Sequence, residues 1–401
     1  MKILHSSDWH LGATLGRFKR TAEFKALLNW LLRVLTERKI EALIISGDIF
    51  DSSIPSNGAA ELYYRFLADA RNTGVRHIIA VAGNHDSASF LEAPKSVLRA
   101  LNCKVVGKAD NANCDEEILP LRNAEGQVEA VVCAVPYLRD RDIRSALSGE
   151  DARQQQESRC SGILRHYRAV CSRAAELYPG IPLIATGHFY AAGGKVSGEN
   201  SVGNLSGIAI SELPQNIDYL AMGHLHIPQC VAGKQNCRYP GSLLQLNFSD
   251  RNTEKKVLIL DTARLAAPPQ EIEVPVFQKM EQITGEIEPL RARIEELRTR
   301  QESVWLRIEN TGEFEPQLPQ LLASFCEDSP LQILSCHNRK PNPMLRRRDS
   351  LGGKKLDELT PEMVFRSLLD ESGGAPERKA ALLRAFREAE TELAESDVKA
   401  E

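Results

Sequence analysis

The feature that most constrains this chain is the alternation of short apolar runs with segments of helical periodicity over residues 1–275. Residues 21–39, for example, carry apolar side chains at the i, i+3, i+4, i+7 spacing of an amphipathic helix. Strands that alternate with helices predict a layered α/β fold. The strand-like runs span residues 2–6, 42–46, 78–82, 131–136, 183–186, 219–222 and 257–260.

A polar cluster follows each of five of these strand-like runs. In α/β sheets, ligands gather outside the carboxyl ends of the strands, so clusters at such an edge can converge on one site. The clusters are Asp8-Trp9-His10, Gly47-Asp48-Ile49-Phe50-Asp51, Gly83-Asn84-His85-Asp86, Gly187-His188-Phe189 and Gly223-His224-Leu225-His226.

The residue types in these clusters indicate a metal site. Imidazoles mixed with carboxylate and amide oxygens, without a thiolate, favour Mn²⁺, Fe²⁺ or Zn²⁺, whereas oxygen-only sites suit Mg²⁺ or Ca²⁺. Seven candidate ligands exceed the needs of one tetrahedral ion. They suit two ions, roughly 3.5–4 Å apart, that share a carboxylate, which is the geometry used for phosphoester hydrolysis. The candidates are Asp8, His10, Asp48, Asn84, His188, His224 and His226.

Each cluster alone also has a purely structural interpretation. Asp8 and His10 by themselves fit a helix cap and a surface histidine, and Gly47-Asp48 by itself fits a turn. The cluster at 223–226 is less ordinary, because histidines at i and i+2 of an extended chain point the same way. The occurrence of all five clusters, each after a strand, favours the metal site.

In this order, the motifs Asp-x-His, Gly-Asp-x-x-Asp, Gly-Asn-His-Asp, Gly-His and Gly-His-x-His resemble those of the calcineurin-like metallophosphoesterases. The opening Met-Lys-Ile-Leu-His-Ser-Ser-Asp-Trp-His-Leu-Gly is especially similar to bacterial nuclease subunits of this family that work beside an SbcC-like coiled-coil ATPase, as are Ala-Gly-Asn-His-Asp-Ser, Ala-Thr-Gly-His and Tyr-Pro-Gly-Ser. The resemblance is strong over residues 1 to about 260 and looser beyond. It implies a metallophosphoesterase β-sandwich flanked by helices, then a small α+β capping domain and a helical C-terminal tail.

The resemblance also implies a role for each candidate. Asp48 would bridge two divalent ions, with Mn²⁺ expected and Fe²⁺ or Mg²⁺ as alternatives. His85 would contact the scissile phosphate and act as general acid, and Asp86 would orient it. Asp51 is expected to support its own turn or a neighbouring ligand. The implied ligands are Asp8, His10 and His226 for the first ion, and Asn84, His188 and His224 for the second.

The chain changes composition after about residue 275. We expect a nuclease domain at 1–275, a capping domain at 276–340, a linker at 341–358 and a helical partner-binding tail at 359–401. The basic run Arg346–Arg348, with Lys354 and Lys355, fits either a solvated linker or a DNA contact. The tail helices carry apolar stripes, which either pack back on their own domain or dock on a partner. The stripe residues are Met363, Val364, Leu368, Leu369, Leu382, Leu383, Phe386 and Leu393.

Together with the two-metal pattern, the resemblance predicts a Mn²⁺-dependent DNA nuclease. The family implies double-strand exonuclease and single-strand or hairpin endonuclease activity in repair, recombination and replication, as a homodimer within a heterotetramer. No Gly-x-x-x-x-Gly-Lys-Ser/Thr loop is present, so ATP dependence would come from the SbcC-like partner. The alternatives are a metallophosphatase acting on a non-DNA phosphoester, and a scaffold whose site is vestigial.

The composition of the chain also indicates the cellular compartment. The nine cysteines include no Cys-x-x-Cys pair and suit a reducing compartment. No run of about 18 apolar residues predicts a membrane span. We therefore expect a cytoplasmic protein. The net charge of −4 does not exclude a nucleic-acid partner, because a local basic patch would suffice.

Overall fold

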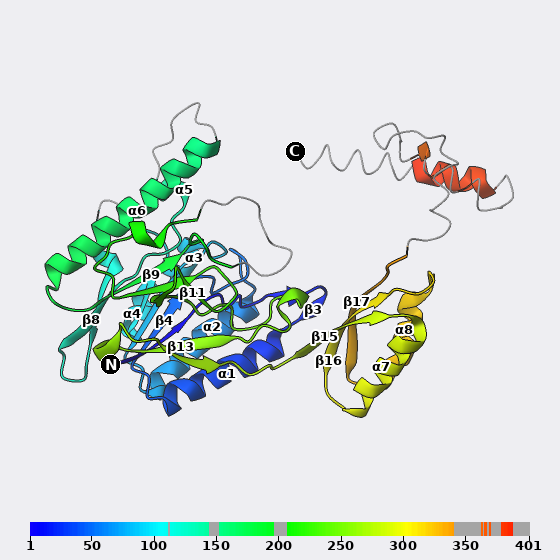
Figure 1. The fold of residues 1–401 in the computed structure, drawn as a ribbon, viewed down its shortest axis with the longest axis horizontal. Coiled ribbons are helices and arrows are strands. Elements are labelled where there is room, and N and C mark those ends of the chain that lie inside the picture. Colours follow the sequence, from blue (N-terminus) through cyan, green and yellow to red (C-terminus); the bar gives the residue numbers. More distant parts are fainter. Residues whose placement is uncertain are drawn as a thin grey trace. The chain divides into compact units, whose positions relative to one another are not determined.

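The computed structural model describes most of the chain, and its central feature is a pair of six-stranded sheets (Figure 1). The described residues are 1–110, 113–143, 152–195, 207–340, 362, 363, 365, 366, 369 and 378–387. The predicted linker at 341–358, with its basic run, lies outside them, as do the tail residues Val364, Leu368 and Leu393. No helix in the described part is both long enough and apolar enough to span a bilayer.

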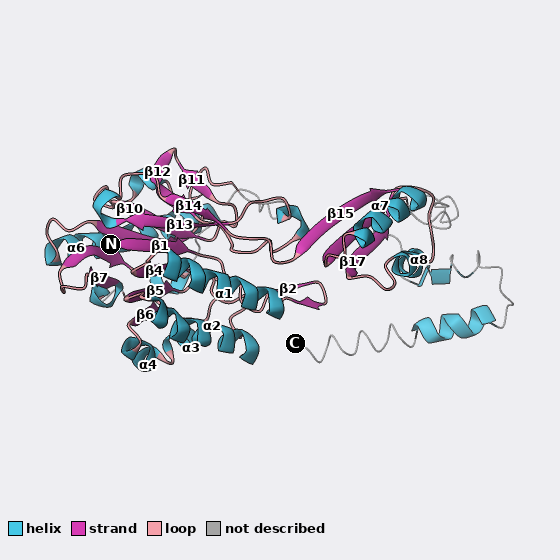
Figure 2. Ribbon diagram, turned by 90° about the horizontal axis from the view of Figure 1, so that it is seen from below, coloured by secondary structure: helices cyan, strands magenta, loops and turns pink. Residues whose placement is uncertain are grey.

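The first sheet places β1 and β4 at its centre, and β1, β4, β5 and β6 run parallel. Helix α1 (Thr21–Glu37) lies against this sheet through the apolar face that its periodicity predicts, and helix α2 (Asn57–Ala70) packs beside it (Figure 2). The side chain of Ser56 caps α2 by accepting from the Ala59 N–H. In sheet order the strands are β14 (Gln270–Glu273), β13 (Lys256–Asp261), β1 (Lys2–Ser6), β4 (Ala42–Ser46), β5 (His77–Val81) and β6 (Cys103–Val106).

The second sheet places β9 and β10 at its centre, and β8, β9, β10 and β12 run parallel. Helix α6 (Ala152–Leu177) packs on it through buried side chains such as Ile163, Tyr167 and Val170. In sheet order the strands are β11 (Gln229–Val231), β12 (Lys234–Tyr239), β10 (Tyr219–Gly223), β9 (Leu183–His188), β8 (Val128–Cys133) and β7 (Ile118–Arg122).

A third core lies between the two sheets. It brings together side chains such as Ile44 and Ile79 from the first sheet with Ile184 and Ala221 from the second. Both sheets are therefore covered on two faces, which is why their central strands are almost continuously apolar. This confirms the predicted α/β class and its β-sandwich.

The remaining elements are shorter. The structure adds a three-stranded sheet with β16 (Val304–Asn310) between β15 (Lys279–Gly285) and β17 (Leu331–Asn338). In the tail, Phe365 and Phe386 stack with ring centroids 4.3 Å apart. The other elements are β2 (Thr14–Leu15), β3 (Phe18–Lys19), α3 (Ala88–Glu92), α4 (Lys95–Ala100), α5 (Asp140–Ile143), α7 (Ile287–Thr299) and α8 (Leu318–Phe325).

Candidate metal centre

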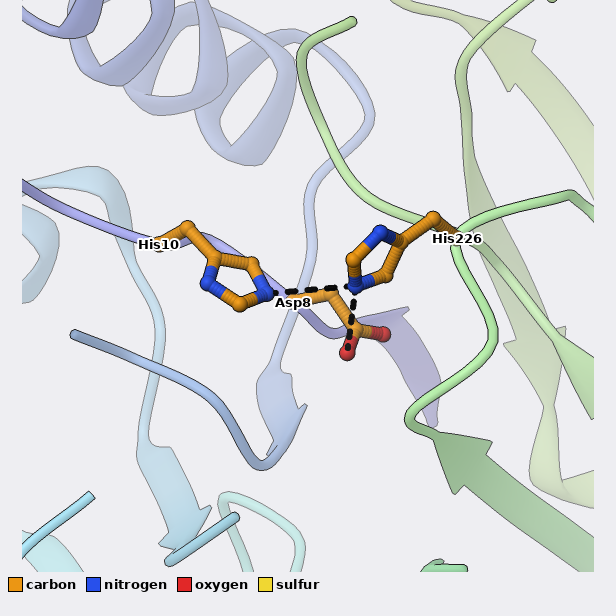
Figure 3. A group of neighbouring side chains, drawn as sticks. All are labelled: Asp8, His10 and His226. Carbon is orange, nitrogen blue, oxygen red and sulfur yellow. Dashed lines mark hydrogen bonds and ion pairs between the residues drawn. The ribbon is translucent and has the colours of Figure 1, made fainter. Parts of the chain in front are cut away.

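The first candidate ion site joins the two sheets. Asp8 and His10 follow β1 of the first sheet, and His226 follows β10 of the second (Figure 3). Nε2 of His226 lies 3.2 Å from Nε2 of His10 and 4.0 Å from Oδ1 of Asp8. The structure thus brings together the three residues that the family resemblance implied for the first ion.

The second group lies at the ends of β5, β9 and β10. Oδ1 of Asn84 lies 3.0 Å from Nε2 of His188 and 3.0 Å from Nδ1 of His224. Two ring nitrogens therefore contact the same amide oxygen. These are the three residues that the family resemblance implied for the second ion.

Asp48, at the end of β4, stands between the two groups. Its Oδ2 lies 3.1 Å from Nε2 of His188 in the second group and 3.7 Å from Nε2 of His10 in the first. Its Oδ1 accepts the backbone N–H of His85 at 2.9 Å. One carboxylate oxygen in contact with both groups is the arrangement that a bridging ligand requires.

The turns that carry these ligands are tight and strained. Asp8, His10 and Asp48 have φ of 51°, 48° and 50°, in the left-handed region that non-glycine residues rarely occupy. Asp8 N–H donates to the Gly47 carbonyl and His10 N–H to the Asp48 carbonyl, both at 3.0 Å. The two turns thus fix one another, and the strain is held where the ligands converge.

Two glycines let these turns approach the ligands closely. A Cβ at Gly83 would overlap the Asp48 carboxylate, and a Cβ at Gly223 would overlap the Ser46 carbonyl. Glycine is required at both positions because the space that a side chain needs is already filled by the site.

Hydrogen bonds behind the ligands set the direction of the imidazoles. Nδ1 of His188 donates to the Ser46 carbonyl at 2.9 Å, and Nδ1 of His10 lies 3.2 Å from Oδ1 of Asp51. Each contact turns Nε2 toward the site, as outer partners of metal-binding histidines do. Asp51 thus contacts a neighbouring ligand, which is one of the two roles expected of it.

Burial and neighbouring charges shift the pKa values of the site residues. Burial opposes charge on Asp48, but the adjacent His188 outweighs it and holds the pKa of Asp48 well below its usual range. Burial would lower the pKa of His188, but Asp48 raises it to about 9. Burial and His188 lower the pKa of His224 to about 4, and burial and His10 lower that of His226 to about 3.

This donor set fits divalent ions. Asp8 and Asp48 are 0% and 1% exposed, and buried carboxylates are normally paired or bound to metal. The neutral imidazoles of His224 and His226 present nitrogen lone pairs, which are the form that metals bind. Oxygen and nitrogen donors without sulfur agree with Mn²⁺, Fe²⁺ or Zn²⁺ chemistry.

His85 and Asp86 have different surroundings. Nδ1 of the exposed His85 donates to the Asp51 carbonyl at 2.9 Å, which leaves Nε2 as the nitrogen able to act on a substrate. Asp86 is fully buried and accepts from the backbone N–H groups of Gly83, Phe50 and Ile49 at 2.8, 2.9 and 3.1 Å.

The geometry therefore gives Asp86 a different role from the one expected. Its carboxylate ties the Asp48 turn to the Asn84 turn, and the His85 ring is held by a backbone carbonyl instead. The reason is burial, which places Asp86 beneath the turns among amides that need an acceptor. Burial and the charge on Asp48 also raise the pKa of Asp86 to about 6.

Sequence reasoning missed Lys255, which precedes β13 and is 1% exposed. Its ammonium donates to the His226 carbonyl at 3.0 Å and to Oγ of Ser242 at 2.9 Å, and lies 3.7 Å from the buried Asp250. Ser242 belongs to the Tyr-Pro-Gly-Ser motif noted in the sequence, but nothing in the pattern around Lys255 marked a buried lysine.

Comparisons with known proteins identify the family of this chain. The family described as calcineurin-like phosphoesterase matches residues 1–228, and a type 5 capsule protein repressor C-terminal domain matches residues 276–372. SbcD, the nuclease subunit of SbcCD, from Escherichia coli strain K12 is 32% identical over 385 residues, which cover 93% of this chain and 94% of that protein. The chain belongs to the SbcD nucleases.

The similarity to SbcD nucleases extends to other bacteria. The SbcD nuclease of Rhodobacter capsulatus is 36% identical over 278 residues, 67% of this chain and 68% of that protein. The SbcD nuclease of Bacillus subtilis is 30% identical over 265 residues, 65% of this chain and 66% of that protein. All seven candidate ligands of this chain lie within residues 1–228, the region that the phosphoesterase family matches.

Proposed function

We propose that this chain is a two-metal phosphodiesterase that cleaves DNA together with an SbcC-like ATPase. The observation that carries the proposal is the position of Asp48 Oδ2, which lies 3.1 Å from Nε2 of His188 and 3.7 Å from Nε2 of His10. The chain's membership of the SbcD nucleases supports the same proposal. The proposed activities are exonuclease action on duplex ends and endonuclease action on single strands and hairpins, in repair, recombination and replication.

The proposed ligands divide as the two groups do. Asp8, His10 and His226 would hold one ion, Asn84, His188 and His224 would hold the other, and Asp48 would serve both. Mn²⁺ is the ion we propose, with Fe²⁺ and Mg²⁺ as alternatives. When bound, the ions supply Lewis acidity for activating water and for offsetting charge on the phosphoryl oxygens.

Among the chain's own side chains, His85 would act as the general acid that protonates the leaving group. The hydrogen bond from Nδ1 of His85 to the Asp51 carbonyl fixes the ring, which leaves Nε2 to deliver the proton. The leaving sugar oxygen is a poor leaving group, so general-acid help is worth roughly 10²–10⁴-fold. Asp86 supports this step indirectly by holding the turns that carry His85 and Asp48.

The proposed assembly is a homodimer within a heterotetramer that contains an SbcC-like coiled-coil ATPase and binds DNA. We assign the nuclease domain to 1–275, the capping domain to 276–340, the linker to 341–358 and partner docking to the tail at 359–401. All nine cysteines are free thiols, which supports a reducing compartment and the cytoplasm as the location.

The test is cleavage of an end-labelled DNA hairpin by the purified chain with Mn²⁺, alone and with its ATPase partner. Wild type should cut, whereas His85→Gln should bind both ions and lose activity by roughly 10²–10⁴-fold. Asp48→Asn should lose both metal and activity. Hydrolysis of a small phosphodiester but of no DNA would favour the alternative, a metallophosphatase acting on another phosphoester.

A further inference from the structure

A cavity opens beside the second group of ligands. It has a volume of about 190 Å³ and adjoins Asn84, His188 and His224. Of the seven candidate ligands, these three alone line it, so it lies on one side of the centre. A group attached to a phosphate at the metal site would meet this cavity on that side.

The walls of the cavity are mainly aromatic and aliphatic. Tyr137 stands at its edge, with its ring centroid 6.3 Å from that of His188 and nearly perpendicular to it. Phe189 and Tyr190 follow His188 directly and also line the cavity. Ring walls of this kind are built for a flat, apolar-faced group.

One cation stands among these rings. The guanidinium of Arg159 lies 5.8 Å from the Tyr137 ring centroid and donates to its hydroxyl at 2.6 Å. Nε of Arg159 also lies 3.4 Å from Asp140. Helix α6 thus holds an arginine over an aromatic wall of the cavity, and arginine planes stack on nucleobases as aromatic rings do.

We propose that this cavity takes the unpaired base of the nucleotide beside the scissile phosphate. The inference rests on the proposed function, because the phosphate must lie at the metal centre. A volume of about 190 Å³ is below the roughly 300–1,000 Å³ of sites for drug-sized ligands, so it suits one base and excludes a base pair. The aromatic walls offer a stacking surface that does not distinguish the four bases.

This occupant restricts the substrate. A base can enter the cavity only after it leaves its partner and its stack, which costs least in single strands, hairpin loops and frayed ends. The nuclease therefore selects unpaired nucleotides next to the bond that it cuts, without selecting a sequence.

The first test uses the wild-type protein with its ATPase partner and Mn²⁺. Labelled single-stranded oligonucleotides carry one abasic residue, placed in turn at each position around the main cleavage site. Loss of the base that occupies the cavity should lower kcat/KM by roughly tenfold or more. Less than a twofold effect at every position, with the intact strand cleaved normally, overturns the inference and leaves the proposed function standing.

The second test fills the cavity. Cys160 on α6 lines it, whereas the next residue, Ser161, is exposed. Cys160→Trp should bind both ions. It should cleave the intact strand as slowly as wild type cleaves the abasic strand, and its kcat/KM should fall no further on the abasic strand. Ser161→Trp is the matched control and should behave as wild type.

The outcomes separate the two claims. A metal-loaded Cys160→Trp protein with wild-type cleavage overturns the inference alone. Absence of all DNA cleavage by wild type, with and without the partner, overturns the proposed function and the inference with it. If Cys160→Trp does not fold, the abasic series still decides, because it needs no variant.

Discussion

Nε2 of His10 and Nε2 of His226 lie 3.2 Å apart, and they come from different sheets of the sandwich. His10 follows β1 in the first sheet, and His226 follows β10 in the second (Figure 3). Burial and His10 lower the pKa of His226 to about 3, so its lone pair faces the neighbouring ring at neutral pH. The side chains of His10, His226 and Asp8 each offer a ligand atom within 4.8 Å of the others, so they could hold one metal ion.

Replacing His226 should therefore remove one ion and leave the other. His226→Ala takes a nitrogen from the first group only, since Asn84, His188 and His224 keep their contacts. We expect Mn²⁺ stoichiometry by mass spectrometry to fall from two to one, with loss of DNA cleavage. His337→Ala, at an exposed histidine of β17, is the control and should retain both ions. Two tightly bound ions in His226→Ala would contradict the assignment.

Gly83→Ala should displace the Asp48 turn, since the new Cβ would overlap the backbone nitrogen of Asp48. The new Cβ would also overlap the Asp48 carboxylate, so the proposed bridging ligand must move. A 1 Å misplacement can cost about 10²-fold in rate, and we expect a loss of at least that size in cleavage. Gly58→Ala is the matched control, because a Cβ at this helical glycine meets open space. Equal activity of the two variants would show that Asp48 tolerates displacement.

The sequence was sufficient to predict where the candidate ligands gather, because each lies at the end of a strand or within four residues after it. Strand periodicity predicts where β1 or β10 ends, and chemistry then singles out Asp8 or His226. The same reasoning could have found α6, whose buried Ile163, Tyr167, Val170 and Ala174 recur at helical spacing, but its polar first turns hid the pattern.

Other features depend on contacts between distant parts of the chain. Whether Asp86 faces His85 or three backbone amides is decided by how two turns from different strands pack. The sequence contains both residues but not that packing. The burial of Lys255 likewise follows from the meeting of the His226 turn with the start of β13, which no local pattern records.

Asp86→Asn should reduce stability and activity together. An asparagine amide keeps one acceptor oxygen and turns an NH₂ toward a backbone N–H, so at least one buried amide is left without a partner. We expect about 1–3 kcal/mol lower free energy of unfolding, measured by urea denaturation. His85→Gln is the comparison, and its unfolding midpoint should stay close to wild type because His85 is exposed. Unchanged stability of Asp86→Asn would contradict the conclusion that the Asp86 carboxylate holds the two turns together.

Lys255 should affect metal binding separately from its effect on stability. Lys255→Met leaves Asp250 as a buried charge, and its two carboxylate oxygens accept no hydrogen bond within the described residues. Breaking a buried pair on one side costs about 3–5 kcal/mol, whereas removing both charges costs far less. The double variant Lys255→Met with Asp250→Asn should therefore recover most of the free energy of unfolding.

The double variant isolates the bond to His226. If Lys255 positions that ligand through its 3.0 Å bond to the carbonyl, the double variant still lacks this support. We expect its affinity for the first Mn²⁺ to stay roughly 10–100-fold below wild type, as for other residues that orient metal ligands. Isothermal titration with Mn²⁺, beside the single variant Asp250→Asn, measures this loss. If the double variant recovers both its free energy of unfolding and its affinity for Mn²⁺, Lys255 acts only as a counter-ion for Asp250 and does not position His226.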